Sequence, residues 1–183
     1  MGDDTLRRAL LAGLFAALAG PAAAHPHVYV VQQASLSLGR TQAVLTYRIA
    51  PSVTNGDHIF DHIDINGDGV LSDAEQGAFI AELLAKTALA VDGARVQATF
   101  IETAFPDRKT MAAGDGVIEV TARAPVTLAA GAAHKVTLGV SYDLFAKDWF
   151  LQPFYFADLA APPPRLERPS GSTAISILVA ADS

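Results

Sequence analysis

Apolar residues alternate with other residues along much of the chain, and this two-residue period predicts β-strands. Residues 41–50 show the pattern most cleanly, with one face made of Ala43, Leu45, Tyr47 and Ile49. Other segments with the composition of strands are residues 28–38, 89–91, 96–103, 117–123, 136–142 and 174–180. Asp92-Gly93, between two of these segments, is the signal for a type I′ hairpin turn. We therefore expect about seven short strands with hairpin turns among them.

One stretch breaks the strand pattern and repeats its apolar residues at helical spacing. These residues flank a polar loop on both sides: Phe60 and Ile63 before it, and Phe79, Ile80, Leu83 and Leu84 after it. Asn55 is placed to cap the first helix. The predicted fold is mainly β: an immunoglobulin-like antiparallel β-sandwich over residues 25–183, with a helix–loop–helix inserted at about residues 55–87.

The polar loop, residues 64–75, matches the twelve-residue calcium loop of an EF-hand at every constrained position. Six positions would offer oxygen ligands to Ca²⁺: Asp64, Asn66, Asp68, Val70 (through its backbone carbonyl), Ser72 and Glu75. Gly69 stands at the sixth position, where the loop turns sharply. Ser72 and Glu75 also have the spacing of a capping box, so the second helix is expected to begin inside the loop. The alternative is an Asp- and Gly-rich surface turn that binds no ion.

Residues 1–24 have the pattern of a cleavable secretory signal peptide. Arg7 and Arg8 supply the positive charge, and residues 9–20 form an apolar run that is short for a membrane span. We expect cleavage after Ala24 and a mature chain that is periplasmic or secreted. An uncleaved membrane anchor is the alternative.

Four histidines fall into two groups that suit a transition metal. Cleavage after Ala24 would start the mature chain at His25, and a free α-amine beside a histidine side chain is a bidentate chelate for copper. His27 adds a second imidazole to this end of the chain. His58 and His62 are four residues apart and share one face of the first predicted helix. We therefore weigh a Ni²⁺, Co²⁺, Cu²⁺ or Zn²⁺ site against the alternative that all four histidines are solvated surface residues.

Composition narrows the possible functions. The 183-residue chain has no cysteine, which removes disulfides and thiolate chemistry. Its net charge is −6 and it has no basic cluster, which argues against nucleic acid as a partner. No nucleophile–base pair and no Gly-rich phosphate loop is recognisable. We therefore expect no catalytic residues, no organic cofactor and no enzyme activity.

Aromatic residues are concentrated in residues 149–156, a segment that begins with the one tryptophan of the chain, Trp149. This composition suits a docking surface for a membrane partner or another protein. It also suits side chains that fill the core at the end of the sandwich.

Three of these features together resemble a bacterial periplasmic family often labelled the periplasmic component of an uncharacterised ABC-type transport system. They are Ala24-His25-Pro26-His27-Val28, the loop at residues 64–75, and the Val91-Asp92-Gly93 hairpin, and the resemblance covers residues 24–103. The chain is also similar to the periplasmic N-terminal segment of some nickel/cobalt exporters. Because genes of that family often lie beside metal permeases, the resemblance implies periplasmic metal handling with a permease of the inner membrane as partner.

The function expected from the sequence is therefore that of a non-enzymatic periplasmic calcium-binding protein with a single EF-hand, accessory to metal transport. The alternative is a transition-metal binding protein or chaperone that uses His25, His27, His58 and His62.

Overall fold

The structure is a computed structural model that describes residues 29–160, 162–170 and 173–181. The predicted signal peptide, its cleavage site, and His25 and His27 lie outside the described residues. Within those ranges, no helix is both long enough and apolar enough to cross a membrane.

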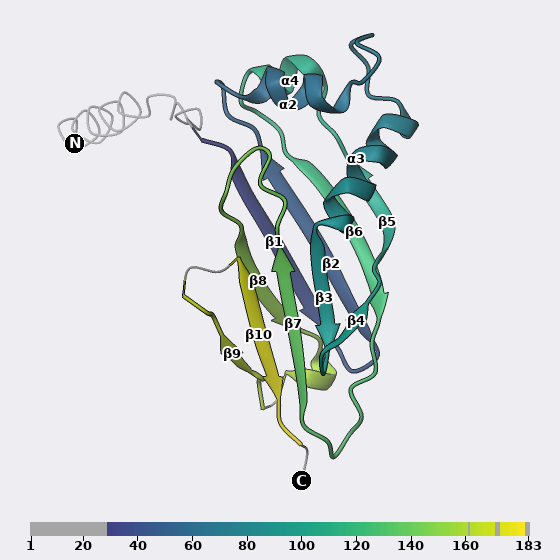
Figure 1. Ribbon diagram of the computed structural model, residues 1–183, viewed down its shortest axis with the longest axis vertical. Coiled ribbons are helices and arrows are strands. Elements are labelled where there is room, and N and C mark those ends of the chain that lie inside the picture. Colours follow the sequence, from purple (N-terminus) through teal and green to yellow (C-terminus); the bar gives the residue numbers. More distant parts are fainter. Residues whose placement is uncertain (1–28, 161, 171–172, 182–183) are drawn as a thin grey trace, which may run out of the picture.

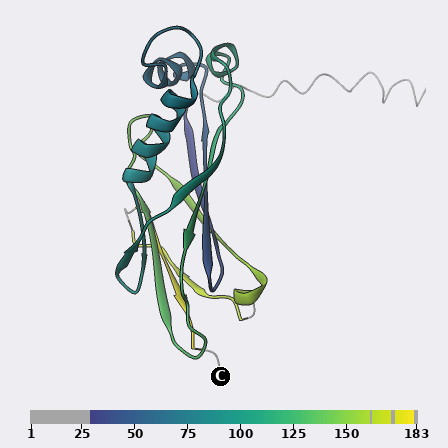
Figure 2. The same ribbon diagram turned by 90° about the vertical axis from the view of Figure 1, so that its right-hand side faces the viewer.

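Two five-stranded sheets form the body of the protein (Figure 1). The first has the order β5-β6-β2-β1-β8 and contains β1 (Val31–Leu38), β2 (Gln42–Ala50), β5 (Thr99–Ala104), β6 (Ile118–Pro125) and β8 (Phe150–Tyr155). The second has the order β4-β3-β7-β10-β9 and contains β3 (Thr87–Val91), β4 (Ala94–Val96), β7 (His134–Val140), β9 (Arg165–Glu167) and β10 (Ala174–Val179). Figure 2 shows the sheets as two layers. The prediction of a mainly β fold with mostly antiparallel sheets is confirmed.

The core is built from the apolar face of each strand, as the two-residue period predicted. The predicted inward residues of β2 are all buried: Ala43, Leu45, Tyr47 and Ile49. Alternate residues of β1, β6 and β7, and the second residue after β7, are buried as well: Ala34, Leu36, Leu38, Ile118, Val120, Ala122, Val136, Leu138, Val140 and Tyr142. Because a slip of one residue would turn such a face to solvent, the alternation fixes the register, with Leu36 opposite Leu45.

One pairing departs from the predicted antiparallel arrangement: β8 runs parallel to β1, with Gln33 opposite Phe150. The physical reason is the direction in which the chain arrives. The last residue of β7, Val140, pairs with Thr87 at the end of the sheet next to the helices. Residues 141–149 then cross to the other sheet, so β8 starts at the same end as β1 (Figure 1).

The described residues contain ten strands rather than about seven. The segment predicted as one strand at residues 96–103 is divided, because β4 pairs with β3 in one sheet and β5 pairs with β6 in the other. The strands β8 and β9 were not predicted. The type I′ turn is confirmed, since Asp92 and Gly93 have φ values of 51° and 84°.

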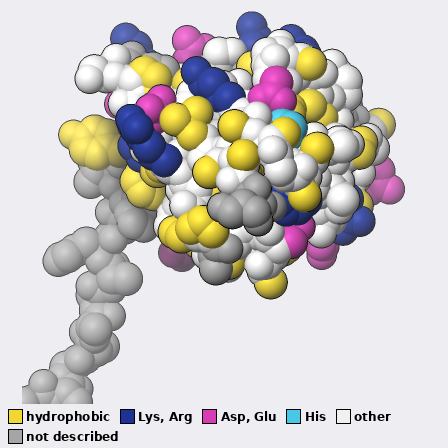
Figure 3. Space-filling view, turned by 90° about the horizontal axis from the view of Figure 1, so that it is seen from below, with side chains coloured by type: hydrophobic (Ala, Val, Ile, Leu, Met, Phe, Trp, Pro, Cys, Tyr) yellow, Lys and Arg dark blue, Asp and Glu magenta, His cyan; other side chains and the backbone are white. Residues whose placement is uncertain are grey.

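Helices gather at one end of the two sheets (Figure 1). They are α2 (Gly56–Ile63), α3 (Asp73–Ala85) and α4 (Arg108–Ala112), and a single 3₁₀ turn, η1 (Ala157–Leu159), lies elsewhere. Both α2 and α3 lie between β2 and β3, as predicted. Helix α4 was not predicted, because five residues are too few to show a helical period. Seen from below, the opposite end mixes hydrophobic, basic and acidic side chains (Figure 3).

The aromatic segment is buried at its start and exposed further along, and its role as a docking surface stays a prediction. Trp149 is buried and its ring meets Tyr47 edge-on, with ring centroids 6.0 Å apart. Phe150 and Phe154 lie on β8, at the edge of its sheet, and are 59% and 46% exposed. The segment therefore fills the core with its first ring and presents later rings to solvent.

Candidate metal centre

The loop between α2 and α3 is fixed to the second helix by its own sequence. Ser72 is the N-cap of α3, and its Oγ accepts a hydrogen bond from the backbone N–H of Glu75 at 3.4 Å. The Glu75 carboxylate in turn accepts the backbone N–H of Ser72 at 2.9 Å. The predicted capping box is therefore confirmed. Leu71 is partly buried and packs against the core, which anchors the loop.

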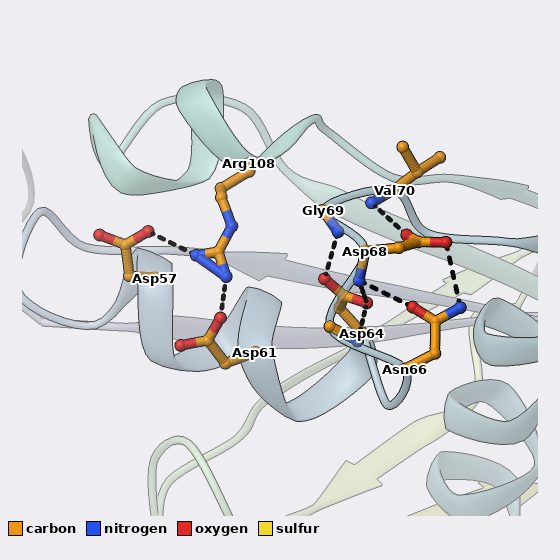
Figure 4. A network of polar contacts seen from close by, with 9 residues as sticks. Asp57, Asp61, Asp64, Asn66, Asp68, Gly69, Val70 and Arg108 are labelled. Atoms are coloured by element: carbon orange, nitrogen blue, oxygen red, sulfur yellow. Dashed lines mark hydrogen bonds and ion pairs between the residues drawn. The ribbon is translucent and has the colours of Figure 1, made fainter.

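The Asp64 carboxylate lies at the centre of the loop (Figure 4). Its Oδ1 accepts the backbone N–H groups of Gly67 and Asp68 at 2.9 and 3.2 Å, and its Oδ2 accepts that of Gly69 at 2.9 Å. Gly67 and Gly69 have φ values of 71° and 84°, a left-handed conformation that glycine adopts without a Cβ clash. The sharp turn predicted at Gly69 is confirmed.

Asn66 and Asp68 face each other on the exposed side of the loop (Figure 4). The Asn66 Oδ1 accepts the Asp68 N–H at 2.8 Å, and the Asn66 Nδ2 donates to the Asp68 Oδ2 at 3.1 Å. The Asp68 Oδ1 accepts the backbone N–H of Val70 at 2.8 Å. The Val70 side chain is exposed, which suits a position where only the backbone carbonyl is required.

The Glu75 carboxylate joins the two ends of the loop. Its Oε1 accepts the backbone N–H of Asn66 at 3.1 Å, and its Oε2 accepts the Ser72 hydroxyl at 2.6 Å as well as the Ser72 N–H. The hydrogen bond from the Ser72 hydroxyl, followed by those from the backbone N–H groups, lowers the pKa of Glu75 below its ordinary value. Glu75 is therefore held as a carboxylate.

Asp64 and Glu75 are the only charged side chains that are buried among the described residues, at 5% and 7% exposure. No Lys, Arg or His of the described chain forms an ion pair with either of them. A buried charge without a counter-charge is costly, and N–H donors offset only part of that cost. Two buried negative charges in a loop of oxygen donors fit a hard divalent cation such as Ca²⁺.

Within the described ranges, no three His, Cys, Asp or Glu side chains are grouped as a ready-made metal cluster. Three of the predicted calcium ligands are donors of another kind, namely the Asn66 amide, the Ser72 hydroxyl and the Val70 carbonyl. A calcium loop therefore does not require three His, Cys, Asp or Glu side chains in one group.

A neighbouring group of charges belongs to a different contact. Arg108 of α4 forms ion pairs with Asp57, at 3.3 Å, and with Asp61, both on α2 (Figure 4). Its guanidinium also lies over the Phe60 ring, 4.9 Å from the centroid. The two aspartates are therefore engaged by α4 rather than by the loop. Sequence reasoning missed Arg108, because nothing near it in the chain marks α2 as its partner.

The structure describes two of the four predicted histidines, His58 and His62, both on α2. His25 and His27 lie outside the described residues, and His58 is exposed on α2. The Nε2 of His62 lies 3.4 Å from Oε2 of Glu82 on α3. The two side chains line a cleft of about 230 Å³ between the helices. His62 therefore bridges α2 to α3, a contact that the sequence did not predict.

Comparison with known proteins gives no assignment: no family model, no curated protein and no solved structure matches the chain. The resemblance to the periplasmic transport-component family stays a prediction.

We expect the metal-free protein to lose the stability that Glu75 contributes as the pH falls below about 4.5, its ordinary pKa. A carboxyl group whose folded-state pKa is depressed contributes stability above its unfolded-state pKa, and the contribution is lost as the pH falls through the folded-state pKa. Urea unfolding of the wild type and Glu75→Gln, from about pH 7 to about pH 3, measures it. The difference in unfolding free energy should shrink with acid, and a constant difference would contradict the assignment.

Proposed function

We propose that the protein is a non-enzymatic calcium-binding protein with a single EF-hand, inserted between β2 and β3 of an immunoglobulin-like sandwich. The observation that carries the proposal is the pair of buried carboxylates without a counter-charge, Asp64 and Glu75, at the two ends of the loop. The residues that would hold Ca²⁺ are Asp64, Asn66, Asp68, Val70, Ser72 and Glu75. Calcium would supply the positive charge that the loop lacks.

The proposed role of the ion is structural. One loop between two helices can fix the end of α2 to the start of α3, whereas EF-hands that act as switches normally work in pairs. The expected affinity is that of extracellular modules, with a Kd of about 10⁻⁴–10⁻³ M. The proposed location is the periplasm and the proposed partner is a metal permease. Both rest on the signal-peptide pattern of residues 1–24 and on the resemblance described above.

Titration of the metal-free protein with calcium, followed by two-dimensional NMR, tests the binding. Resonances of the loop should shift with a single midpoint in the range given above. Asp64→Ala should abolish the shifts, because it removes the carboxylate at the centre of the loop. Asp73→Asn should keep them, since Asp73 is exposed and outside the ligand positions. Unchanged binding by Asp64→Ala would overturn the proposed site.

The transition-metal alternative is favoured by one distance. Two ligands bound at about 2.0–2.1 Å to one tetrahedral ion lie about 3.3 Å apart, close to the 3.4 Å between His62 Nε2 and Glu82 Oε2. We propose this pair, with His25, His27 and His58 as further donors, as a second candidate site for Ni²⁺, Co²⁺, Cu²⁺ or Zn²⁺. Zinc affinity should fall at least tenfold in His62→Ala. Equal affinity of His62→Ala and the wild type would exclude the pair.

A further inference from the structure

A remote segment of the same chain, residues 141–149, packs against both helices that flank the loop. Phe145 of this segment stacks on Phe79 of α3, with centroids 6.2 Å apart and planes at 21°, and meets His62 of α2 edge-on at 5.6 Å. Tyr142 meets Phe79 edge-on at 5.9 Å and Phe145 at 5.6 Å. Rings from residues 141–149 therefore contact both helices that flank the loop.

The same segment continues into the core and into strand β8. The Trp149 Nε1 donates to the Tyr142 carbonyl at 2.5 Å, and Trp149 is followed directly by Phe150, the first residue of β8. The Gln32 Nε2 donates to the Ala146 carbonyl at 2.8 Å, which ties the segment to β1. Residues 141–149 therefore form a strap that runs from the helices to the edge strand of the first sheet.

The strap is held on the helices mainly by packing of its aromatic rings. Ser141 donates its backbone N–H and its Oγ to the Lys86 carbonyl at the end of α3, at 2.8 and 3.0 Å. Tyr142, in contrast, has a buried hydroxyl with no hydrogen-bond partner in the described part of the chain. Burial, and to a lesser degree the charge of Glu82, raise the pKa of this hydroxyl well above its usual range. Because an unpaired buried hydroxyl is costly, the ring contacts with α3 have to offset that cost.

We infer that calcium binding at residues 64–75 controls the seating of the strap, that is, how firmly residues 141–149 are held on the helices. Through Trp149, it also controls how firmly the first residues of β8 are held. This inference rests on the proposed function. Glu75 lies in the first turn of α3, and Phe79 lies four residues later on the same face of the helix. An ion that links Glu75 to Asp64 at the end of α2 therefore fixes the ring on which Phe145 stacks. Without the ion, only hydrogen bonds from Asn66 and Ser72 hold Glu75 to the rest of the loop, so α3 and the strap are less firmly held.

The consequence concerns the exposed edge of the first sheet. Phe150 and Phe154 project from β8, which begins where the strap ends. Calcium therefore sets how firmly this apolar edge is held in place. An ion can shift such an equilibrium only by its difference in affinity for the two states, so the shift follows calcium occupancy.

The single tryptophan makes the coupling measurable. We expect the fluorescence of Trp149 to change with calcium, at the same midpoint as the NMR shifts of the loop. Amide hydrogen exchange in residues 141–149 should slow by up to about 10- to 100-fold at calcium concentrations of about 10 to 100 times Kd, because only the seated state binds the ion tightly.

Phe145→Leu keeps an apolar side chain but removes the stack on Phe79. It should lose most of the fluorescence response, and it should bind calcium more weakly to the extent that it unseats the strap, because the coupling is reciprocal. Phe154→Ala, which removes an exposed ring of β8 away from the helices, should keep the response.

Each outcome decides a different point. Calcium binding without a change in Trp149 fluorescence or in hydrogen exchange overturns the coupling and leaves the proposed calcium site intact. A full response in Phe145→Leu overturns the route through the aromatic rings. Absence of calcium binding in the wild type overturns both the coupling and the proposed function.

Discussion

Replacing Glu75 with Gln should remove most of the calcium-dependent stabilisation, whereas the calcium-free stability at neutral pH should fall only by what the charged hydrogen bonds of Glu75 contribute. With a Kd of about 10⁻⁴–10⁻³ M, calcium at about 10 mM stabilises the wild type by about 1.4–2.7 kcal/mol. The substitution removes a buried carboxylate that is a bidentate ligand in EF-hand loops. The new amide oxygen can still accept the Ser72 N–H, so the capping box survives. Urea unfolding at neutral pH, with calcium and with a chelator, measures both stabilities.

Asp73→Asn is the matched control for that experiment. Asp73 is the first residue of α3 and is exposed, so the substitution removes one negative charge from the loop without removing a predicted ligand. Its calcium-dependent stabilisation should stay close to that of the wild type. If both variants lose the same amount, the effect of calcium is charge screening rather than coordination. If Glu75→Gln keeps the full stabilisation, residues 64–75 are not the calcium site.

The local geometry of the loop could be predicted because its determinants are neighbours in the chain. The capping box of Ser72 and Glu75 spans one turn, and the positive φ of Gly69 follows from its place in the loop pattern. The contacts that position the two helices could not be predicted. The residues concerned, Arg108 and Phe145, come from remote segments. Arg108 forms an ion pair with α2, and Phe145 packs on α3, but nothing in the sequence of those segments indicates either contact.

The same distinction explains the fold. Which residues of β2 face inward is a local property, and the prediction was correct for all four. Sheet membership is not local: the chain changes sheets between Val96 and Thr99, and the strand pattern continues across that change. Pro153 could have marked residues 149–156 as an edge strand, because proline lacks the N–H that a central strand needs. That signal would have predicted an edge strand but not its parallel pairing with β1.

Gly56→Ala should destabilise the protein strongly, lowering the free energy of unfolding by about 3 kcal/mol or more. Gly56 is the first residue of α2 and is buried against α4. A Cβ at this position would overlap the backbone carbonyl of Met111 and crowd the backbone nitrogen of Ala112. Because these atoms belong to the main chain, no side-chain rotation can relieve the overlap, and α2 and α4 must separate. Urea unfolding of the calcium-free protein measures the loss.

The control is a second helical glycine, Gly77 in α3, where an added Cβ would meet no atom within 4 Å. Gly77→Ala should stabilise the protein by about 0.5–1 kcal/mol, because alanine loses less backbone entropy in a helix. Equal stability of the two variants would show that α2 and α4 are not in contact at Gly56. The contact also bears on the ion, because α2 ends at the Asp64 C-cap. Gly56→Ala should therefore weaken calcium binding as well as stability, whereas Gly77→Ala should leave calcium binding unchanged.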